Sequence, residues 1–406
     1  MSLRVALLAS RCLPWHDPGG LERHVHHLAR HLRRRGIEVD LFISTPEHPA
    51  DPFAGDSGFR LEIVPGRAFL RRRFTVVLSR STTYLLFSLR MGRAVAKAAA
   101  TRGYAAVIAQ GATAFGYAVA AARQGLRTPI VLNPQGMEEA VTPNALKRAL
   151  YLPMRAAIRY AAARSAAVVA TDEVLVDAVR RVLDVPPERI VVLPNAVDVQ
   201  ECRALATEVG KAEALETAGA TDARPLLVTV GRLAPNKGFA VALDALARVR
   251  GALPAGWLWA IVGDGPMRPA LESRADALGL STNVRFLGGL DDRHMHNLVA
   301  SADLFLNPTL YEGSSLVTLE AMAHGVPIVA TSAGGIPDKI REGETGWVAP
   351  PGNAEALAAA LRRWLAATRG EQRRRGEAAR RLCETRFDWS VAAERWERTI
   401  RDLSGL

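Results

Sequence analysis

The feature that most constrains this chain is a regular alternation of short apolar segments with segments of helical periodicity. Leu3 to Ala9 has the composition of a buried strand, and apolar residues then recur three and four apart between Leu21 and Leu32. Gly36 offers a helix stop, and Ile37 to Ile43 is a second strand candidate. A strand, a helix and a strand in this order indicate parallel strands joined by a crossover.

The alternation continues and then restarts, which indicates two doubly wound domains. A chain of 406 residues is also longer than one ordinary core. The segment after Pro194 is rich in alanine and glutamate, and we place the boundary there. Further strand candidates are 106–109, 130–132, 167–170 and 190–193, and then 226–230, 258–262, 284–287, 304–307 and 328–330. We expect an α/β protein with Rossmann-like domains over 1–197 and 198–385, and a helix over 386–406 that packs back on the first domain.

The excess of positive over negative charge lies in the first half of the chain. The net charge is +11 overall, and residues 60–164 alone carry 17 basic side chains against three glutamates. Such a field attracts phosphate groups of a nucleic acid, an anionic membrane surface or a phosphorylated substrate. The alternative is that arginines are spread over solvated faces.

Cysteine usage and the N-terminus favour a cytoplasmic protein. Cys12, Cys202 and Cys383 lie far apart without metal-ligand spacing, so we interpret them as reduced thiols. The first apolar segment is too short for a signal peptide, and no apolar run reaches the ~18–20 residues that span a bilayer.

Two glycine-containing loops follow predicted strands, where parallel sheets bind ligands. Gly19 and Gly20 stand at a helix start, where backbone N–H groups can approach an anion, although a plain tight turn is an equal alternative. Arg232 and Lys237 follow the first strand of the second domain. Two cations at that position suit a diphosphate.

A third loop carries the sharpest signal. Gly313 and the serines Ser314 and Ser315 are expected to open a helix whose free N–H groups can hold phosphate. Glu312 precedes this opening, and Glu320 lies about two turns inside an otherwise apolar helix. A carboxylate buried there needs hydrogen-bond donors, and sugar hydroxyls would serve.

Taken together, these segments resemble the family 4 glycosyltransferases of the GT-B fold, in which two Rossmann-like domains face a central cleft. The resemblance covers nearly the whole chain, and the spacing from Glu312 to Glu320 matches the family's E-x7-E motif. The segments that carry it are GGLERHVHHLARHLRRRGIEVDLF, VVLPNAVD, VGRLAPNKG, VGDGP, NVRFLGGL and EGSSLVTLEAMAHGVPIVATSAGG.

The resemblance implies a role for each matching residue. Gly19 and Gly20 would meet the donor diphosphate from one side, and the catalytic cations Arg232 and Lys237 from the other. Glu312 would hold donor-sugar hydroxyls and Glu320 the ribose. The remaining donor-binding positions would be Gly313, Ser314 and the backbone of Ser315, Leu316 and Val317 for the phosphates, and Phe286, Leu287 and Gly288 for the nucleobase.

The resemblance also implies a hexosyltransferase that retains the anomeric configuration by front-face attack and needs no metal or other cofactor. One departure concerns the acceptor side: Gln135 stands where the family often has histidine, and an amide cannot take a proton at neutral pH. Glu138 is a weak alternative candidate for the group that accepts a proton on the acceptor side. Ser314 replaces the usual phenylalanine, and Gln110 stands where a histidine-rich strand end is common.

The resulting hypothesis is a retaining transferase that moves a sugar from a nucleotide sugar to a glycan or lipid-linked acceptor in cell-surface polysaccharide or glycolipid synthesis. Residues 60–164 would meet an anionic membrane, which makes the protein peripheral at its inner face. A sugar epimerase of the same fold is the alternative. A nucleic-acid-binding protein is disfavoured, since aromatic and basic residues are not interleaved as base stacking requires.

Overall fold

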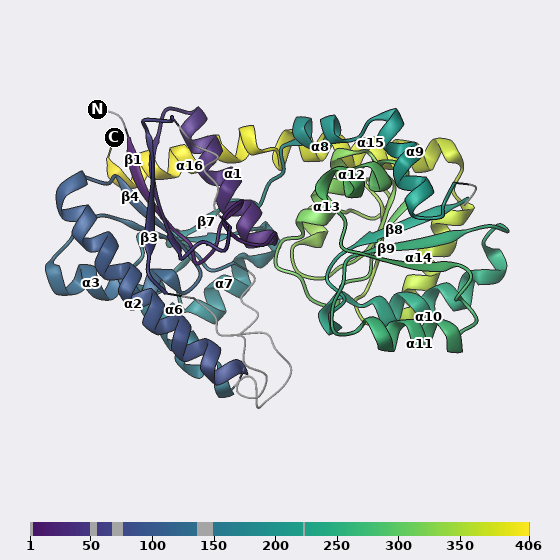
Figure 1. Cartoon of the computed structure of the whole chain (residues 1–406), viewed down its shortest axis with the longest axis horizontal. Coiled ribbons are helices and arrows are strands. Elements are labelled where there is room, and N and C mark those ends of the chain that lie inside the picture. The colour runs from purple at the N-terminus through teal and green to yellow at the C-terminus, as the bar shows by residue number, and fades with distance from the viewer. Residues whose placement is uncertain (1–2, 49–54, 67–75, 136–148, 222–223, 406) are drawn as a thin grey trace. The chain divides into compact units, whose positions relative to one another are not determined.

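A computed structural model describes residues 3–48, 55–66, 76–135, 149–221 and 224–405. It divides into two compact units (Figure 1). The first comprises Met1–Pro194 together with Trp389–Leu406, and the second comprises Asn195–Asp388. The chain therefore leaves the first unit at Pro194 and re-enters it at Trp389, three residues from each of the boundaries expected at 197 and 385.

The first unit is built on a parallel sheet with the strand order β3-β2-β1-β4-β5-β6-β7. Its central strands are buried because both faces are covered, as their continuous apolar sequences require. The strands are β1 (Arg4–Leu8), β2 (Glu38–Ser44), β3 (Phe59–Val64), β4 (Ala106–Gln110), β5 (Ile130–Asn133), β6 (Ala167–Ala170) and β7 (Ile190–Val192).

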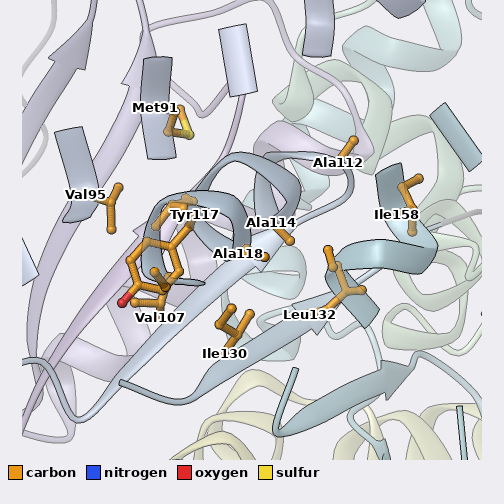
Figure 2. Close-up of a cluster of buried hydrophobic side chains, with 14 of the residues drawn as sticks. Met91, Val95, Val107, Ala112, Ala114, Tyr117, Ala118, Ile130, Leu132 and Ile158 are labelled. Carbon is orange, nitrogen blue, oxygen red and sulfur yellow. The ribbon is translucent and has the colours of Figure 1, made fainter. Parts of the chain in front are cut away.

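A cluster of small, aliphatic and aromatic side chains joins this sheet to the helices α2 (Val76–Arg102), α3 (Thr113–Gln124) and α6 (Leu152–Arg164) (Figure 2). Helices α2 and α3 approach closely through glycine. A Cβ atom at Gly116 would lie 1.7 Å from the Ser88 carbonyl oxygen, and the Ser88 hydroxyl donates to the Ala112 carbonyl at 2.8 Å. Helix α7 (Val176–Leu183) contributes Val179 and Leu183 to the same cluster.

The last helix, α16 (Trp389–Ser404), packs against α1 (Gly20–Arg34) of the first unit. Trp389 is fully buried there and lies against three histidines of α1. Ring-centroid distances to Trp389 are 5.5 Å for His24, 6.0 Å for His27 and 5.5 Å for His31. Burial lowers the pKa of His24 to about 4 and that of His27 to about 3, so both rings are neutral at pH 7.

The second unit repeats the architecture with the parallel strand order β10-β9-β8-β11-β12-β13. Its strands are β8 (Leu226–Val230), β9 (Leu258–Val262), β10 (Val284–Gly288), β11 (Leu304–Asn307), β12 (Ile328–Thr331) and β13 (Trp347–Ala349). Separate apolar clusters cover its two faces. One involves α8 (Val199–Leu205), α9 (Glu208–Thr217), α12 (Asp292–Ala300), α13 (Leu316–Ala323) and α15 (Arg369–Arg386), and the other α10 (Phe239–Val249), α11 (Arg268–Ala277) and α14 (Ala354–Ala366).

The expected strands all occur, and two further strands, β3 and β13, were not anticipated. Both stand at the edge of their sheet. Among the described residues, no helix combines the length and apolarity needed to cross a membrane.

Candidate functional site

Each sheet has a point where the direction of chain winding reverses. In the second unit the chain runs from β8 outward to β9 and β10, and then returns to β11 on the other side of β8. The loops that leave β8 and β11 therefore lead to helices on opposite faces of the sheet, α10 and α13. Open parallel sheets bind ligands at such a switch point. The corresponding switch point of the first unit lies between β1 and β4.

The loop after β8 is fastened to the loop after β11 by backbone contacts. The Asn236 carbonyl accepts the Leu310 N–H at 2.8 Å and the Thr309 hydroxyl at 3.0 Å. Gly238 has φ +69°, and a Cβ atom there would lie 2.0 Å from the Pro308 carbonyl oxygen. Only glycine fits that approach, which places the preceding Lys237 beside the second loop.

Lys237 and Glu312, to which the family resemblance assigns the diphosphate and the donor sugar, form an ion pair. Both side chains are partly buried, with 25% and 18% of their surface exposed. Arg232 is exposed, and the described residues offer its side chain no hydrogen-bond or ion-pair partner. The site therefore holds one neutralised cation and one that is available to an anion.

The N-terminus of α13 lies at the same switch point. Its N-cap is Ser315, whose hydroxyl accepts the Thr318 N–H at 3.4 Å and the Thr318 hydroxyl at 2.9 Å. Asn307, at the end of β11, donates to the Thr318 hydroxyl at 2.8 Å. The N–H groups of Leu316 and Val317 have no partner within the helix, as at every helix start, and the helix dipole favours an anion there.

Glu320 lies inside α13 and is 7% exposed, as expected for a carboxylate in an apolar helix. The pKa of the Cys202 thiol on α8 is held well above its usual value. Burial of the thiol is the main cause, and the negative charge of Glu320 is the next. Helices α13 and α8 pack together on the same face of the sheet.

The proposed nucleobase segment forms the end of the edge strand β10. The Phe286 carbonyl accepts a hydrogen bond from the Arg268 guanidinium at 3.0 Å, and the Gly288 carbonyl accepts the Gly263 N–H at 2.7 Å. Phe286, Leu287 and Gly288 are half-buried, and Gly288 has φ +73°. This segment is two strands away from β8, at the carboxyl end of the same sheet.

In the first unit, Gly19 is the N-cap of α1 and Gly20 its first residue. The Glu22 side chain folds back over this helix end, so that a Cβ atom at Gly19 would lie 2.5 Å from its Oε2. Arg11 pairs with Glu22 at 3.0 Å and with Glu47 at 2.8 Å. The helix end to which the family resemblance assigns the donor diphosphate thus already faces a carboxylate of its own chain.

The acceptor-side glutamine Gln135 has a left-handed backbone, with φ +58°. Its N–H donates to the Asn133 side-chain oxygen at 3.1 Å, and its amide donates to the Gln110 side-chain oxygen at 2.5 Å. Gln135 and Gln110 therefore form one amide pair at the carboxyl ends of β5 and β4. Glu138 lies outside the described residues.

Comparison with known proteins agrees with this arrangement. Residues 18–201 match the family described as Glycosyltransferase Family 4, and residues 211–382 match the family described as Glycosyl transferases group 1. The alpha-D-kanosaminyltransferase of Streptomyces kanamyceticus is 30% identical over 358 residues, which are 84% of this chain and 89% of that protein. The chain belongs to the family 4 glycosyltransferases. It is a transferase of the GT-B fold, and its relatives give no support to an epimerase or a nucleic-acid-binding protein.

Two further similarities bear on this glycosyltransferase. A GDP-mannose-dependent monoacylated alpha-(1-6)-phosphatidylinositol monomannoside mannosyltransferase of Corynebacterium glutamicum is 34% identical over 213 residues, or 50% of this chain and 54% of that protein. The Anabaena protein HepE, solved in complex with UDP and glucose, superposes with a TM-score of 0.74 at 20% identity. That comparison covers 98% of this chain and 100% of HepE, and it shows the shared fold.

Sequence reasoning missed several residues that hold the glycosyltransferase's loop 312–315. The Gly335 N–H donates to the Gly313 carbonyl at 2.9 Å, and the Asn195 amide donates to the Ser314 carbonyl at 3.4 Å. Lys339 is fully buried and donates to the Ser314 hydroxyl at 3.1 Å. The scarcity of lysine in this arginine-rich chain was a signal for Lys339, but nothing in the sequence showed what it contacts.

The second unit of the glycosyltransferase can thus perform two chemical tasks at one place. Its cations and the α13 N-terminus can stabilise negative charge on a leaving phosphate. The carboxylates of Glu312 and Glu320 can accept hydrogen bonds from hydroxyl groups.

Proposed function

We propose that this glycosyltransferase moves a sugar from a nucleotide sugar to a glycan or lipid-linked acceptor, in cell-surface polysaccharide or glycolipid synthesis. One observation carries the proposal: Arg232, Lys237, Glu312 and the α13 N-terminus all belong to the two loops at the switch point of one sheet. A nucleotide sugar needs such a pairing of cations for its diphosphate with carboxylates for its hydroxyls. HepE, which shares the fold, was solved with UDP.

Within this proposal, Arg232 and Lys237 hold the diphosphate and stabilise charge on the departing phosphate. Glu312, oriented by Lys237, accepts hydrogen bonds from the donor sugar, and Glu320 accepts them from the ribose. The backbone of Ser315 to Val317 binds phosphate oxygens. The remaining contacts are those of Gly313 and Ser314 with the donor, of Gly19 and Gly20 with the diphosphate, and of Phe286, Leu287 and Gly288 with the nucleobase.

Retention of the anomeric configuration and independence of metal are further parts of the proposal. The two cations and the helix N-terminus can neutralise the leaving diphosphate without a divalent ion. Activity that persists in excess EDTA, with an α-linked product from an α-linked donor by proton NMR, would agree with both. An inverted product would refute the retaining assignment.

The first experiment is a thermal-shift screen with UDP, ADP, GDP, TDP and their sugars. A specific donor should raise the melting temperature in proportion to its affinity. Glu320→Ala should then lose donor hydrolysis and sugar transfer while it keeps the fold. Glu216→Ala, which removes an exposed glutamate of α9, is the matched control. Wild-type turnover in Glu320→Ala would refute the assigned role.

For the acceptor side we propose contact with an anionic membrane through residues 60–164. Two exposed leucines support it, Leu86 on α2 at 61% and Leu152 at the start of α6 at 57%, together with the exposed Arg90 and Arg93. Apolar side chains among cations suit the headgroup region of a bilayer. This would place the enzyme in the cytoplasm, peripheral to the inner face of the membrane.

Not every cation of this region is available to a membrane. Arg102 pairs with Asp40 and with Glu62, both at 2.7 Å, and so joins α2 to β2 and β3. Binding to vesicles with 30% anionic lipid should weaken in Leu86→Ser and in Arg90→Gln/Arg93→Gln, measured by sedimentation. Unchanged binding would refute this surface. The arginines 71–73, which the sequence also suggests, lie outside the described residues.

A further inference from the structure

The amide pair of Gln110 and Gln135 is the part of the first unit to which the proposed function gives no role. Gln110 is the last residue of β4, and the switch point of this sheet lies between β1 and β4. Open parallel sheets bind ligands beyond the carboxyl ends of their strands at such a point. Gln135 follows the end of β5, the next strand of the sheet. Both residues therefore stand where the first unit would hold a ligand of its own.

Gln110 is held so that only one end of its amide is used. Its backbone carbonyl accepts the Thr113 hydroxyl at 2.7 Å, and the adjacent Gly111 N–H donates to the Asn133 carbonyl at 2.7 Å. The Gln110 residue is 1% exposed, and its side-chain oxygen accepts the Gln135 amide N–H at 2.5 Å. Its amide nitrogen is buried and has no hydrogen-bond partner within the described residues.

Two features of this pair lower the stability of the folded chain. The buried amide nitrogen of Gln110 loses the hydrogen bonds that it makes with water in the unfolded chain. Gln135 has φ +58°, a left-handed conformation that is unfavourable outside glycine. Strained backbone and unpaired polar groups cluster at sites that bind ligands. Their coincidence in one amide pair at a switch point indicates a functional role.

The hydrogen bond from Gln135 to Gln110 fixes which atom Gln135 presents. Its amide nitrogen faces Gln110, so its amide oxygen is directed elsewhere. Gln135 is only partly buried, and no other described residue hydrogen-bonds to its side-chain oxygen. An amide oxygen accepts a hydrogen bond without taking a proton at neutral pH. It therefore suits a neutral hydroxyl group and offers nothing to a carboxylate or a phosphate.

We propose that Gln135 accepts a hydrogen bond from a hydroxyl of the sugar acceptor, and that Gln110 is the residue that positions it. Gln110 acts through Gln135 and does not itself touch the acceptor. Its unpaired nitrogen is the cost of supplying a neutral oxygen at the end of β4. The inference rests on the proposed function and deepens it, because it gives the acceptor a neutral hydroxyl-binding group in the first unit.

The test separates acceptor turnover from stability. Sugar transfer is measured with the donor that the thermal-shift screen identifies, and with methyl glucoside, methyl galactoside and methyl mannoside as acceptors. Gln110→Met removes the amide and keeps the length of the side chain. We expect its KM for the glycoside to rise about fivefold, while its KM for the donor changes by less than about twofold. Its melting temperature should equal or exceed that of the wild type, because the unpaired nitrogen is gone.

Two further variants supply the rescue and the control. Gln110→Glu keeps an oxygen that accepts from Gln135, so its KM for the glycoside should stay within about twofold of the wild type. Its buried carboxylate should nevertheless lower the melting temperature. Gln124→Met removes an exposed glutamine at the end of α3 and should change neither quantity. A merely structural role predicts instead that stability and KM worsen together in each variant.

The other outcomes overturn the inference. An unchanged KM for the glycoside in Gln110→Met, or a rise that only accompanies a lower melting temperature, would leave the pair structural. Gln110→Glu that is impaired as much as Gln110→Met would show that Gln135 is not held by an accepting oxygen. An effect on the KM of the donor alone would assign Gln135 to the donor sugar instead.

A variant at position 135 covers a failure to fold. Should a variant at Gln110 not fold, Gln135→Asn decides, since asparagine tolerates the left-handed backbone and its amide is one methylene too short to reach Gln110. An unchanged KM for the glycoside in Gln135→Asn overturns the inference. So does a wild type that binds a nucleotide sugar but transfers it to none of the three glycosides. A wild type that binds no nucleotide sugar refutes the proposed function itself.

Discussion

Replacing Gly334 with alanine should greatly reduce sugar transfer, because the added Cβ atom would overlap the backbone of a neighbouring loop. Gly334 has φ +53°, a left-handed conformation that L-residues rarely adopt. Its Cα faces the loop that carries the ion-paired Glu312, and an added Cβ atom would lie 1.6 Å from the Glu312 carbonyl oxygen. Backbone meets backbone at this contact, so no side-chain rotation can relieve the overlap.

The size of the effect follows from that distance. Real Cβ contacts essentially never fall below 3.0 Å, so the two loops would have to separate by about 1.4 Å. A misplacement of about 1 Å at a catalytic group can cost about 100-fold in rate. We therefore expect kcat/KM for sugar transfer to fall about 100-fold, or about 2.7 kcal/mol of transition-state stabilisation.

Gly343→Ala is the matched control. Gly343 has φ +80°, and a Cβ atom there would meet nothing within 4 Å. Both variants therefore carry the left-handed strain of about 1 kcal/mol, and only Gly334→Ala adds the overlap. The assay is release of nucleotide and transfer of sugar at varied donor concentration, with melting temperatures measured in parallel. Equal activity of the two variants would refute the reasoning.

Three further predictions concern the first unit. Glu22→Gln removes the carboxylate that faces the α1 N-terminus, so we expect nucleotide binding to become about threefold tighter in calorimetry. Weaker binding would contradict the proposed role of Gly19. Burial lowers the pKa of His24 from 6.5 to about 4. Between these pH values the unfolded state binds more protons than the folded state, so the free energy of unfolding should fall as the pH drops from 6.5 to about 4. Urea midpoints across that range should decline less in His24→Leu. Gly116→Ala should lower the melting temperature by about 10 °C, because its Cβ would overlap the Ser88 carbonyl.

Apolar continuity explains which strands could be predicted from the sequence. Strands such as β4 and β6 are buried on both faces, so they read as uninterrupted apolar runs. The edge strand β3 instead contains Arg60 and Glu62 and is only partly buried, and β13 has three residues. Neither gives a periodic signal long enough to recognise.

The sequence predicted the part of the candidate site whose residues lie close together along the chain. Glu312, Ser315 and Glu320 belong to one loop and one helix, so their spacing alone indicated a shared site. The contacts of Lys339 and Asn195 with Ser314 join residues 25 and 119 positions apart. No local pattern encodes such a contact, because it depends on how the strands are ordered in the sheet.

The two switch points differ in how far they are prepared for an anion. In the second unit the loops are fastened by the Asn236 carbonyl, by closely packed glycines and by Lys339, so Lys237, its partner Glu312 and the helix N-terminus are oriented before any ligand arrives. Fixed dipoles of this kind cost no reorganisation during the reaction. In the first unit the α1 N-terminus faces the Glu22 carboxylate. Under the proposed role of Gly19 and Gly20, a diphosphate at this helix end would have to displace that carboxylate. The second unit should therefore supply most of the donor affinity, and the contribution of Gly19 and Gly20 should be smaller than the free helix end alone would suggest.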